Sequence, residues 1–146
     1  MELIEKKMNL FNVDNKYYFA HCISADAGTD NRAMNLGIVV EFNKRFHMKS
    51  KIKEYARTEQ ICIGDSILID RVFNLITKSK YYGKPTYNTL INALKNMKNQ
   101  IINNNIKYLA IPRLGCGLDR LQYGKVKEII ENIFKDIDIK ILVCKL

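Results

Sequence analysis

The segment Tyr108–Asp119 reads YLAIPRLGCGLD, in which an apolar run of strand length passes directly into a Gly-x-Gly turn. Apolar residues then recur at the spacing of one helix face from Val126 to Ile137. A strand, a glycine turn and a helix in this order aim backbone N–H groups at an anion. The segment therefore predicts an α/β fold with a phosphate-bearing nucleotide ligand, although a Gly-x-Gly turn alone is as often only structural.

Asp119 strengthens the functional interpretation of this turn. A carboxylate beside an anion-binding turn is electrostatically unfavourable, and it is tolerated where it acts on the ligand. The alternative is that Asp119 caps the helix that begins near Tyr123, which is a common role for aspartate.

Outward from this segment, the chain alternates strands with helices. Short apolar runs predict further strands at Leu3–Lys7, Tyr17–Ile23, Ile61–Ile63, Ser66–Ile69, Val72–Thr77 and Ile139–Cys144. Gly64-Asp65 is predicted to be the hairpin turn between the third and fourth of these runs. One helix is predicted to open at Leu36 and to continue in broken form toward Tyr55, and another to follow the N-cap Thr86.

This order of elements predicts a single domain over residues 1–146, an α/β fold whose parallel or mixed central sheet is sandwiched between helices. Ligands in such folds bind outside the carboxyl ends of the strands. The segments that follow Ile23, Thr77 and Ile111 are therefore expected to converge on one cleft.

The composition limits the class of protein. The chain has 146 residues, of which 47% are hydrophobic and 27% charged, as in a folded domain rather than a disordered one. No apolar run approaches the roughly 18–20 residues that span a bilayer. Glu2 and Glu5 stand where a signal peptide carries basic residues. We therefore expect a cytoplasmic protein without a membrane partner.

The cysteines and histidines do not form a metal motif. The four cysteines are widely spaced, and there are only two histidines, from which a zinc site cannot easily be assembled. We expect free thiols in a reducing compartment, with no metal and no cofactor. His21 and Cys22 are neighbours in a strand and face opposite sides of the sheet, which disfavours a Cys–His nucleophile.

The net charge of +9 attracts phosphates, and nucleic acid is the commonest partner of such a surface. Basic and aromatic residues that could hold a nucleic-acid strand are Lys44, Arg45, Lys49, Lys51, Lys53, Lys80, Tyr81, Tyr82 and Lys84. The alternative is a solvated lysine-rich surface, which the scattered placement of the charge favours.

Lys78 ends the apolar run Val72–Thr77, where its amine is expected to be partly removed from water. Burial disfavours the charged form of a lysine and frees its neutral amine as a nucleophile. The alternative is an exposed loop lysine like its neighbours Lys80 and Lys84.

Five motifs occur in one order along the chain. They are HCIS at His21–Ser24, a small-residue helix opening around Gly37, LITK at Leu75–Lys78, KPTY at Lys84–Tyr87 and PRLGCGLDRLQ at Pro112–Gln122. Together they resemble the macrodomain family, and closely its branch of ADP-ribose glycohydrolases that release ADP-ribose from glutamate and related acyl esters. Related macrodomains reverse the ADP-ribosylation of nucleobases. The resemblance runs from about Met8 to Leu146, nearly the whole chain.

The resemblance implies an α/β/α sandwich that binds ADP-ribose in a cleft. In this branch the lysine that ends LITK attacks the anomeric carbon of the distal ribose, and the aspartate of GCGLD acts as acid and base to release the covalent lysyl intermediate. These residues are Lys78 and Asp119 here. The ligand-binding positions that the resemblance implies are Asn9, Leu10, Ser24, Gly37, Ile38, Pro112, Arg113, Leu114, Gly115, Cys116, Gly117, Leu118 and Leu146.

Each part of the ligand has its expected contacts within this set. Arg113–Leu118 would hold the diphosphate. Ser24 and Gly37 would line the ribose and phosphate region. Leu10 and Leu146 would flank the adenine.

The chain departs from the family pattern at three places. Asn9 stands where the family commonly has an aspartate that contacts the adenine amino group. Ala27–Met34 is longer than in close relatives, and Asn35-Leu36-Gly37 replaces Gly-Ala-Gly. The last two lie at the rim of the distal-ribose pocket, where the group attached to ADP-ribose would sit.

The predicted activity is removal of ADP-ribose from acidic side chains by a monomeric enzyme, with O-acetyl-ADP-ribose as a further substrate. One alternative is the hydrolysis of ADP-ribosylated DNA bases. Others are a non-catalytic ADP-ribose reader, whose signature would be loss of Lys78 or Asp119, and a nucleic-acid-binding module with a vestigial cleft.

Overall fold

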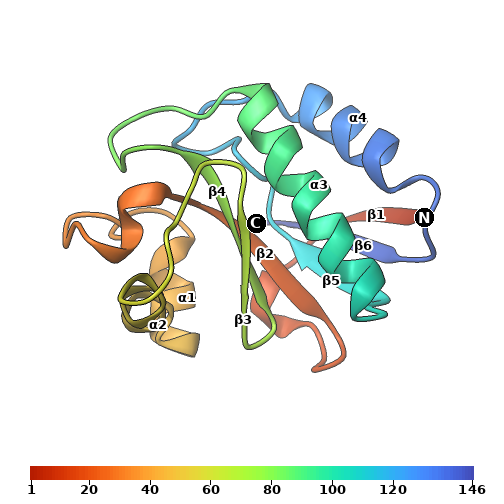
Figure 1. Ribbon diagram of the computed structural model, residues 1–146. Helices are drawn as coiled ribbons and strands as arrows, with labels where there is room; N and C mark the ends of the chain where they lie inside the picture. The colour runs from red at the N-terminus through yellow and green to blue at the C-terminus, as the bar shows by residue number, and fades with distance from the viewer.

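The computed structural model describes residues 1–146 as a six-stranded sheet with helices on both faces (Figure 1). The strands are β1 (Glu2–Lys7), β2 (Tyr18–Ser24), β3 (Ser66–Ile69), β4 (Val72–Lys78), β5 (Tyr108–Ile111) and β6 (Lys140–Lys145). The helices are α1 (Val39–Phe46), α2 (Met48–Ala56), α3 (Tyr87–Asn103) and α4 (Tyr123–Phe134), with short 3-10 helices η1 (Leu10–Asn12) and η2 (Ala25–Gly28). The predicted α/β sandwich with a mixed sheet is confirmed.

The strands lie across the sheet in the order β1-β6-β5-β2-β4-β3. Every neighbouring pair is parallel except β3 and β4, which form an antiparallel hairpin. β2 lies between β4 and β5, so the carboxyl ends of these three strands point the same way. At that edge Ser24 of β2 pairs with Lys78 of β4, beside the loop that follows β5. The expected convergence of three segments on one edge is confirmed.

The sheet separates two apolar cores. α3 and α4 pack on one face, and α1 and α2 on the other (Figure 1). Alternation along β4 serves both cores, because Phe73 and Leu75 face α3 and α4 whereas Ile76 faces α1 and α2. All three side chains are fully buried, and each such burial contributes about 1.5–3 kcal/mol to stability. The strand that ends in Lys78 is therefore fixed from both sides.

Local sequence signals account for the beginning of α3 and for the break between α1 and α2, but not for the beginning of α1. The Thr86 hydroxyl accepts from the N–H of Thr89 at 3.1 Å, and the Thr89 hydroxyl accepts from the N–H of Thr86 at 3.0 Å, which caps α3 as predicted. His47 is left-handed, with a φ of 53°, and makes the expected break between α1 and α2. The predicted opening at Leu36 is wrong, because Gly37 has a φ of +80° and α1 begins only after it.

The predicted strand at Ile61–Ile63 is also wrong. The Asp65 carboxylate accepts from the N–H of Cys62 at 2.9 Å and closes a turn in which Gly64 has a φ of +93°. Gly64 and Asp65 then exchange backbone hydrogen bonds with Ile76 at the edge of the sheet. The turn was placed correctly, but the hairpin joins β3 to β4 instead.

His21 lies fully buried between β2 and α1. Its Nε2 is 2.6 Å from Oδ1 of Asn74, and its ring stacks on that of Phe42 at a centroid distance of 4.1 Å. The neighbouring Cys22 packs toward the opposite core, as expected for adjacent strand residues. Burial lowers the pKa of His21 to about 4, so the ring is neutral near pH 7 and donates through Nε2.

Folding stability should fall as the pH drops below the ordinary pKa of histidine. The unfolded chain binds a proton on His21 near pH 6.5, whereas the folded chain binds it only near pH 4. Through this residue alone, the free energy of unfolding in urea titrations should fall by about 2 kcal/mol between about pH 7.5 and pH 5. His21→Gln, which keeps an amide donor toward Asn74, should remove this part of the pH dependence. Parallel pH profiles for the two proteins would contradict the assignment.

Candidate active site

A continuous cleft opens at the carboxyl ends of β2, β4 and β5. It consists of two adjoining cavities, of about 380 Å³ and 640 Å³, that share Lys78 and Asp119 in their walls. The first cavity lies at the β4–α3 connection and is also lined by Ser24, Arg32, Met34, Asn35, Tyr81, Tyr82, Lys84 and Arg120. The second cavity follows the glycine loop, Pro112–Leu118, and is also lined by Gly37, Ile38, Cys144 and Leu146.

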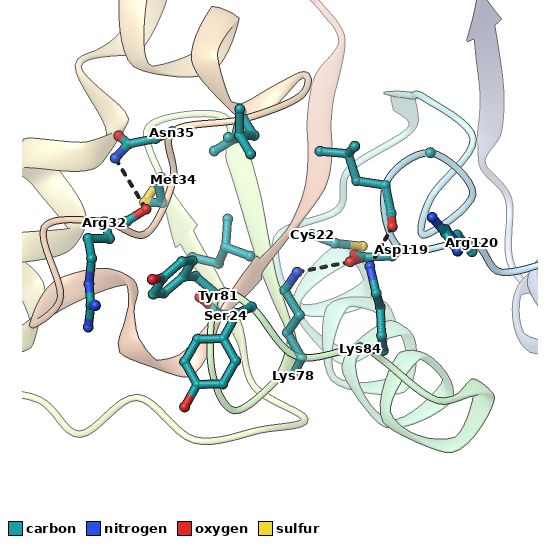
Figure 2. A pocket seen from close by; sticks show the side chains of 16 residues that line it. Cys22, Ser24, Arg32, Met34, Asn35, Lys78, Tyr81, Lys84, Asp119 and Arg120 are labelled. Carbon is teal, nitrogen blue, oxygen red and sulfur yellow. Dashed lines mark hydrogen bonds and ion pairs between the residues drawn. The ribbon is translucent and has the colours of Figure 1, made fainter.

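Lys78 and Asp119 form an ion pair in the wall of this cleft (Figure 2). Lys78 is the last residue of β4, Asp119 lies in the loop after β5, and Nζ and Oδ1 are 2.9 Å apart. Only 16% of the Lys78 side chain and 14% of the Asp119 side chain are exposed. Both alternatives considered from the sequence are therefore wrong: Lys78 is not an exposed loop lysine, and the N-cap of α4 is Gln122 rather than Asp119.

The chemistry available to this pair follows from its shielding from water. A charge left without its partner in such a place costs several kcal/mol, so the two groups hold each other in position. A carboxylate at hydrogen-bond distance can also take a proton from the ammonium and leave a neutral, nucleophilic amine. The pair can therefore combine nucleophilic attack with proton transfer.

The glycine loop keeps its shape through backbone hydrogen bonds. The N–H of Leu121 donates to the carbonyl oxygen of Gly115 at 2.7 Å. Gly115 has a φ of +72°, and a Cβ there would lie 2.7 Å from Cδ1 of Leu121. A Cβ on Gly117, in contrast, would have no atom within 4 Å. Because α4 begins only at Tyr123, the loop itself, and not a helix N-terminus, faces the cleft.

Arg113 places a positive charge beside this loop. Its guanidinium lies over the ring of Tyr123, 4.4 Å from the centroid. Its Nε is buried without a hydrogen-bond partner, and the residue lines the second cavity. A bound anionic group would give this guanidinium an acceptor.

A buried carboxylate outside the expected set shapes the first cavity. Asp26 accepts from the Ser24 hydroxyl at 2.5 Å and from the N–H of Tyr81 at 3.1 Å. It thereby ties the end of β2 to the β4–α3 connection. The Tyr81 ring lines the cavity, and the Arg32 guanidinium lies over that ring, 5.3 Å from its centroid.

Two lysines of α2 anchor the long stretch Ala27–Met34. Nζ of Lys49 donates to the carbonyl oxygen of Asn31 at 2.7 Å, and Nζ of Lys53 donates to the side-chain oxygen of the same residue at 2.8 Å. These two members of the predicted nucleic-acid cluster therefore hold the rim of the first cavity.

Most of the ligand-binding positions expected from the resemblance lie along the cleft. Ser24 lines the first cavity, and Gly37, Ile38, Pro112–Leu118 and Leu146 line the second. Asn9 and Leu10 line neither, because Leu10 is buried in a core and the Asn9 side chain accepts from the N–H of Phe11 at 2.9 Å to cap η1. The contacts of all these residues with a ligand stay predictions.

The sequence did not indicate Arg32 or Arg120 as part of the first cavity, and it indicated Tyr81 and Tyr82 only as members of the nucleic-acid cluster. Arg32 is a single basic residue in a loop, and no neighbouring residue distinguishes it from other surface cations, whereas Arg120 directly follows Asp119 in the PRLGCGLDRLQ motif, a signal that could have found it. Lys84 belongs to the predicted nucleic-acid cluster and to the KPTY motif, and the motif indicates its place beside the cleft.

The structure places no group of three or more histidine, cysteine, aspartate or glutamate side chains where they could hold a metal ion. None of its helices is long and apolar enough to cross a membrane. The four cysteines are unpaired, and burial raises the pKa of Cys22 to about 12, which keeps this thiol of the cleft protonated.

Comparison with solved structures defines the class of the fold, although no family model matches the sequence. The macrodomain of Thermus aquaticus DarG has a TM-score of 0.85 at 19% identity, covering 99% of this chain and 98% of that one. Thermosipho africanus DarTG in complex with ADP-ribose has a TM-score of 0.84 at 15% identity, covering 99% of this chain and 42% of that one. The fold, with its cleft at the strand ends, is that of a macrodomain.

A sequence relative narrows the class further. The chain is 36% identical over 141 residues to the ADP-ribose glycohydrolase OARD1 of Homo sapiens. The matched region covers 94% of this chain and 87% of OARD1. The chain therefore belongs to the macrodomain ADP-ribose glycohydrolases, the family of OARD1, as its motifs indicated.

Alanine substitutions at the two loop glycines should separate backbone strain from the mere loss of a glycine. Gly115→Ala forces a side chain into the left-handed region and against Leu121, so the free energy of unfolding in urea should fall by about 1–3 kcal/mol. Gly117→Ala meets no atom within 4 Å and should change it by less than about 0.5 kcal/mol. Equal effects of the two substitutions would show that the loop does not depend on Gly115.

Proposed function

We propose that this protein removes ADP-ribose from acidic side chains, with mono-ADP-ribosyl-glutamate as the substrate, and that it also hydrolyses O-acetyl-ADP-ribose. The observation that carries the proposal is the Lys78–Asp119 pair, 2.9 Å apart and largely shielded from water in the wall of the cleft. Kinship with OARD1, which is named an ADP-ribose glycohydrolase, supports it.

ADP-ribose would lie along both cavities. The diphosphate belongs at the glycine loop, where the Arg113 guanidinium has a free donor, and the adenine belongs at the end lined by Leu146. The distal ribose then reaches Lys78 and Asp119, which both cavities share. The group attached to that ribose would occupy the first cavity.

In the first half of the reaction, Asp119 takes a proton from the Lys78 ammonium and the neutral amine attacks C1″ of the distal ribose. A C–N bond forms as the C1″–O bond to the acyl group breaks. The electron pair of the broken bond leaves with the carboxylate of the glutamate. Because a carboxylate is a stable anion, this leaving group needs no proton.

In the second half, water replaces the lysine. Asp119, having lost its proton to solvent, accepts a proton from the water that attacks C1″, and the electron pair of the C–N bond returns to the Lys78 nitrogen. Asp119 then returns the proton to the amine, which restores the ion pair. The sum consumes one water and yields ADP-ribose, a free carboxylate and a proton.

A second candidate substrate is an ADP-ribosylated DNA base. The observation that favours it is the wall of the first cavity, where Tyr81 and Tyr82 could stack on bases while Arg32 and Lys84 meet phosphates. A base that leaves through nitrogen needs a proton, which Asp119 would hold after the first transfer. A non-catalytic reader fits less well, because both reactive residues are present and paired.

We further infer that the enzyme works as a monomer in the cytoplasm, with ADP-ribose and ADP-ribosylated proteins as its partners. Four unpaired cysteines suit a reducing compartment. Lys78, Asp119 and the glycine loop all belong to one chain, so the proposed reaction needs no residue of a second copy.

Lys78→Ala should abolish turnover, because it removes the amine that is paired with Asp119 and that would attack C1″, and the rate should fall by more than about 10³-fold. Binding of ADP-ribose, measured by calorimetric titration, should stay within about threefold, since the glycine loop is untouched. Lys95→Ala is the matched control, as Lys95 is exposed on α3 and its side chain makes no hydrogen bond or ion pair. Unchanged hydrolysis by Lys78→Ala, after contaminating enzyme is excluded, would contradict the proposed function.

Glutamate-linked and base-linked ADP-ribose should be compared side by side at about 50 and 200 mM salt. We expect faster release from glutamate, with little dependence on salt for either substrate. Contacts to several phosphates would make the rate on ADP-ribosylated single-stranded DNA fall steeply over this range. A steep fall confined to the DNA substrate would favour the second candidate.

A further inference from the structure

The connection between β4 and α3 contacts the loop of Asp119 at two points. Nζ of Lys84 donates to the carbonyl oxygen of Leu118 at 2.8 Å. The Tyr87 hydroxyl accepts from the N–H of Gln122 at 3.1 Å. The two hydrogen bonds therefore hold the chain on either side of Asp119.

The loop needs such support, because Asp119 lies in a stretch without regular secondary structure. Its internal hydrogen bonds run from Arg120 to Gly117 and from Leu121 to Gly115, and they close tight turns. Arg120 has a φ of 62°, which is unfavourable for a residue with a side chain and persists only where surrounding contacts enforce it. The position of Asp119 is therefore not set by the loop alone.

The supporting residues are themselves well fixed. Lys84 is followed by the buried Pro85 and then by Thr86, whose capping box begins α3. Tyr87 is the first residue of that helix, which packs against the sheet through one of the two cores. Figure 2 shows the Lys84 side chain running beside that of Lys78 toward the loop of Asp119.

We propose that Lys84 and Tyr87 are positioning residues that hold Asp119 at proton-transfer distance from Lys78. The proposal rests on the proposed function, since this distance matters only if the two groups react. Proton transfer requires hydrogen-bond distance, and a misplacement of about 1 Å in an active site costs about 10²-fold in rate. Residues 78–87 thus carry the nucleophile Lys78 and also hold in place Asp119, the group that takes its proton.

Lys84→Met tests the first contact, because it keeps the length of the side chain and removes the donor. We expect kcat on glutamate-linked ADP-ribose to fall about 10–100-fold, while the Kd for ADP-ribose stays within about threefold. Lys84→Arg keeps a donor and should recover most of kcat. Tyr87→Phe removes only the acceptor for Gln122, so its loss should be smaller, about 3–10-fold.

Lys95→Met is the matched control, since it removes the same charge from an exposed site on α3. Hydrogen–deuterium exchange supplies a readout that does not depend on catalysis. The amides of Arg120 and Leu121 should exchange faster in Lys84→Met and at the wild-type rate in Lys95→Met. Urea titrations should show similar unfolding free energies for both variants, because Lys84 is exposed.

The outcomes discriminate between the two proposals. Weaker binding of ADP-ribose with unchanged kcat would overturn the positioning role and make Lys84 a ligand contact. Wild-type kcat together with wild-type exchange would overturn it as well. Full activity of Lys78→Ala would overturn the proposed function, and the positioning role with it, whereas an inactive Lys78→Ala beside a fully active Lys84→Met would overturn the positioning role alone.

Discussion

The parallel pairing of β2 with β4 on one side and with β5 on the other determines where chemistry can occur in this protein. Parallel strands end at one edge, so the loops that follow them must share the space there. β4 is packed between two cores, and its packing, rather than the surface loops, therefore fixes the position of Lys78 at the end of the strand. The loop after β5 is less constrained, yet it brings Asp119 to Lys78 from 41 positions away.

The elements that place the site could be predicted because their signals are local. The apolar runs Val72–Thr77 and Tyr108–Ile111 coincide with β4 and β5 to within a residue, and Thr86 caps α3 as its sequence indicates. The rule for strand ends then put Lys78 and the glycine loop on one edge without knowledge of the strand order. The main error was local too, since the Asp65 side chain closes a turn where the apolar pattern suggested a strand.

What could not be predicted depends on side chains from distant segments. Asp26 reaches Tyr81 across 55 positions and Lys84 reaches Leu118 across 34, and no local pattern records such contacts. The apolar run before Lys78 indicated that its amine is partly removed from water, but its pairing with Asp119 became visible only beside the loop after β5. Family resemblance identified Lys78 and Asp119 as the reacting pair, whereas the residues that line the first cavity could be identified only in the folded structure.

The contacts of the β4–α3 connection also limit how recognition can be redesigned. An added or deleted residue within Ser79–Thr86 would displace Lys84 from Leu118, so this connection and the loop after β5 can be exchanged between relatives only as a matched set. Ala27–Met34 is different, because long lysine side chains anchor it from outside and can adjust to a change of length. Chimeric enzymes with altered substrate range are therefore best built by swapping that stretch alone.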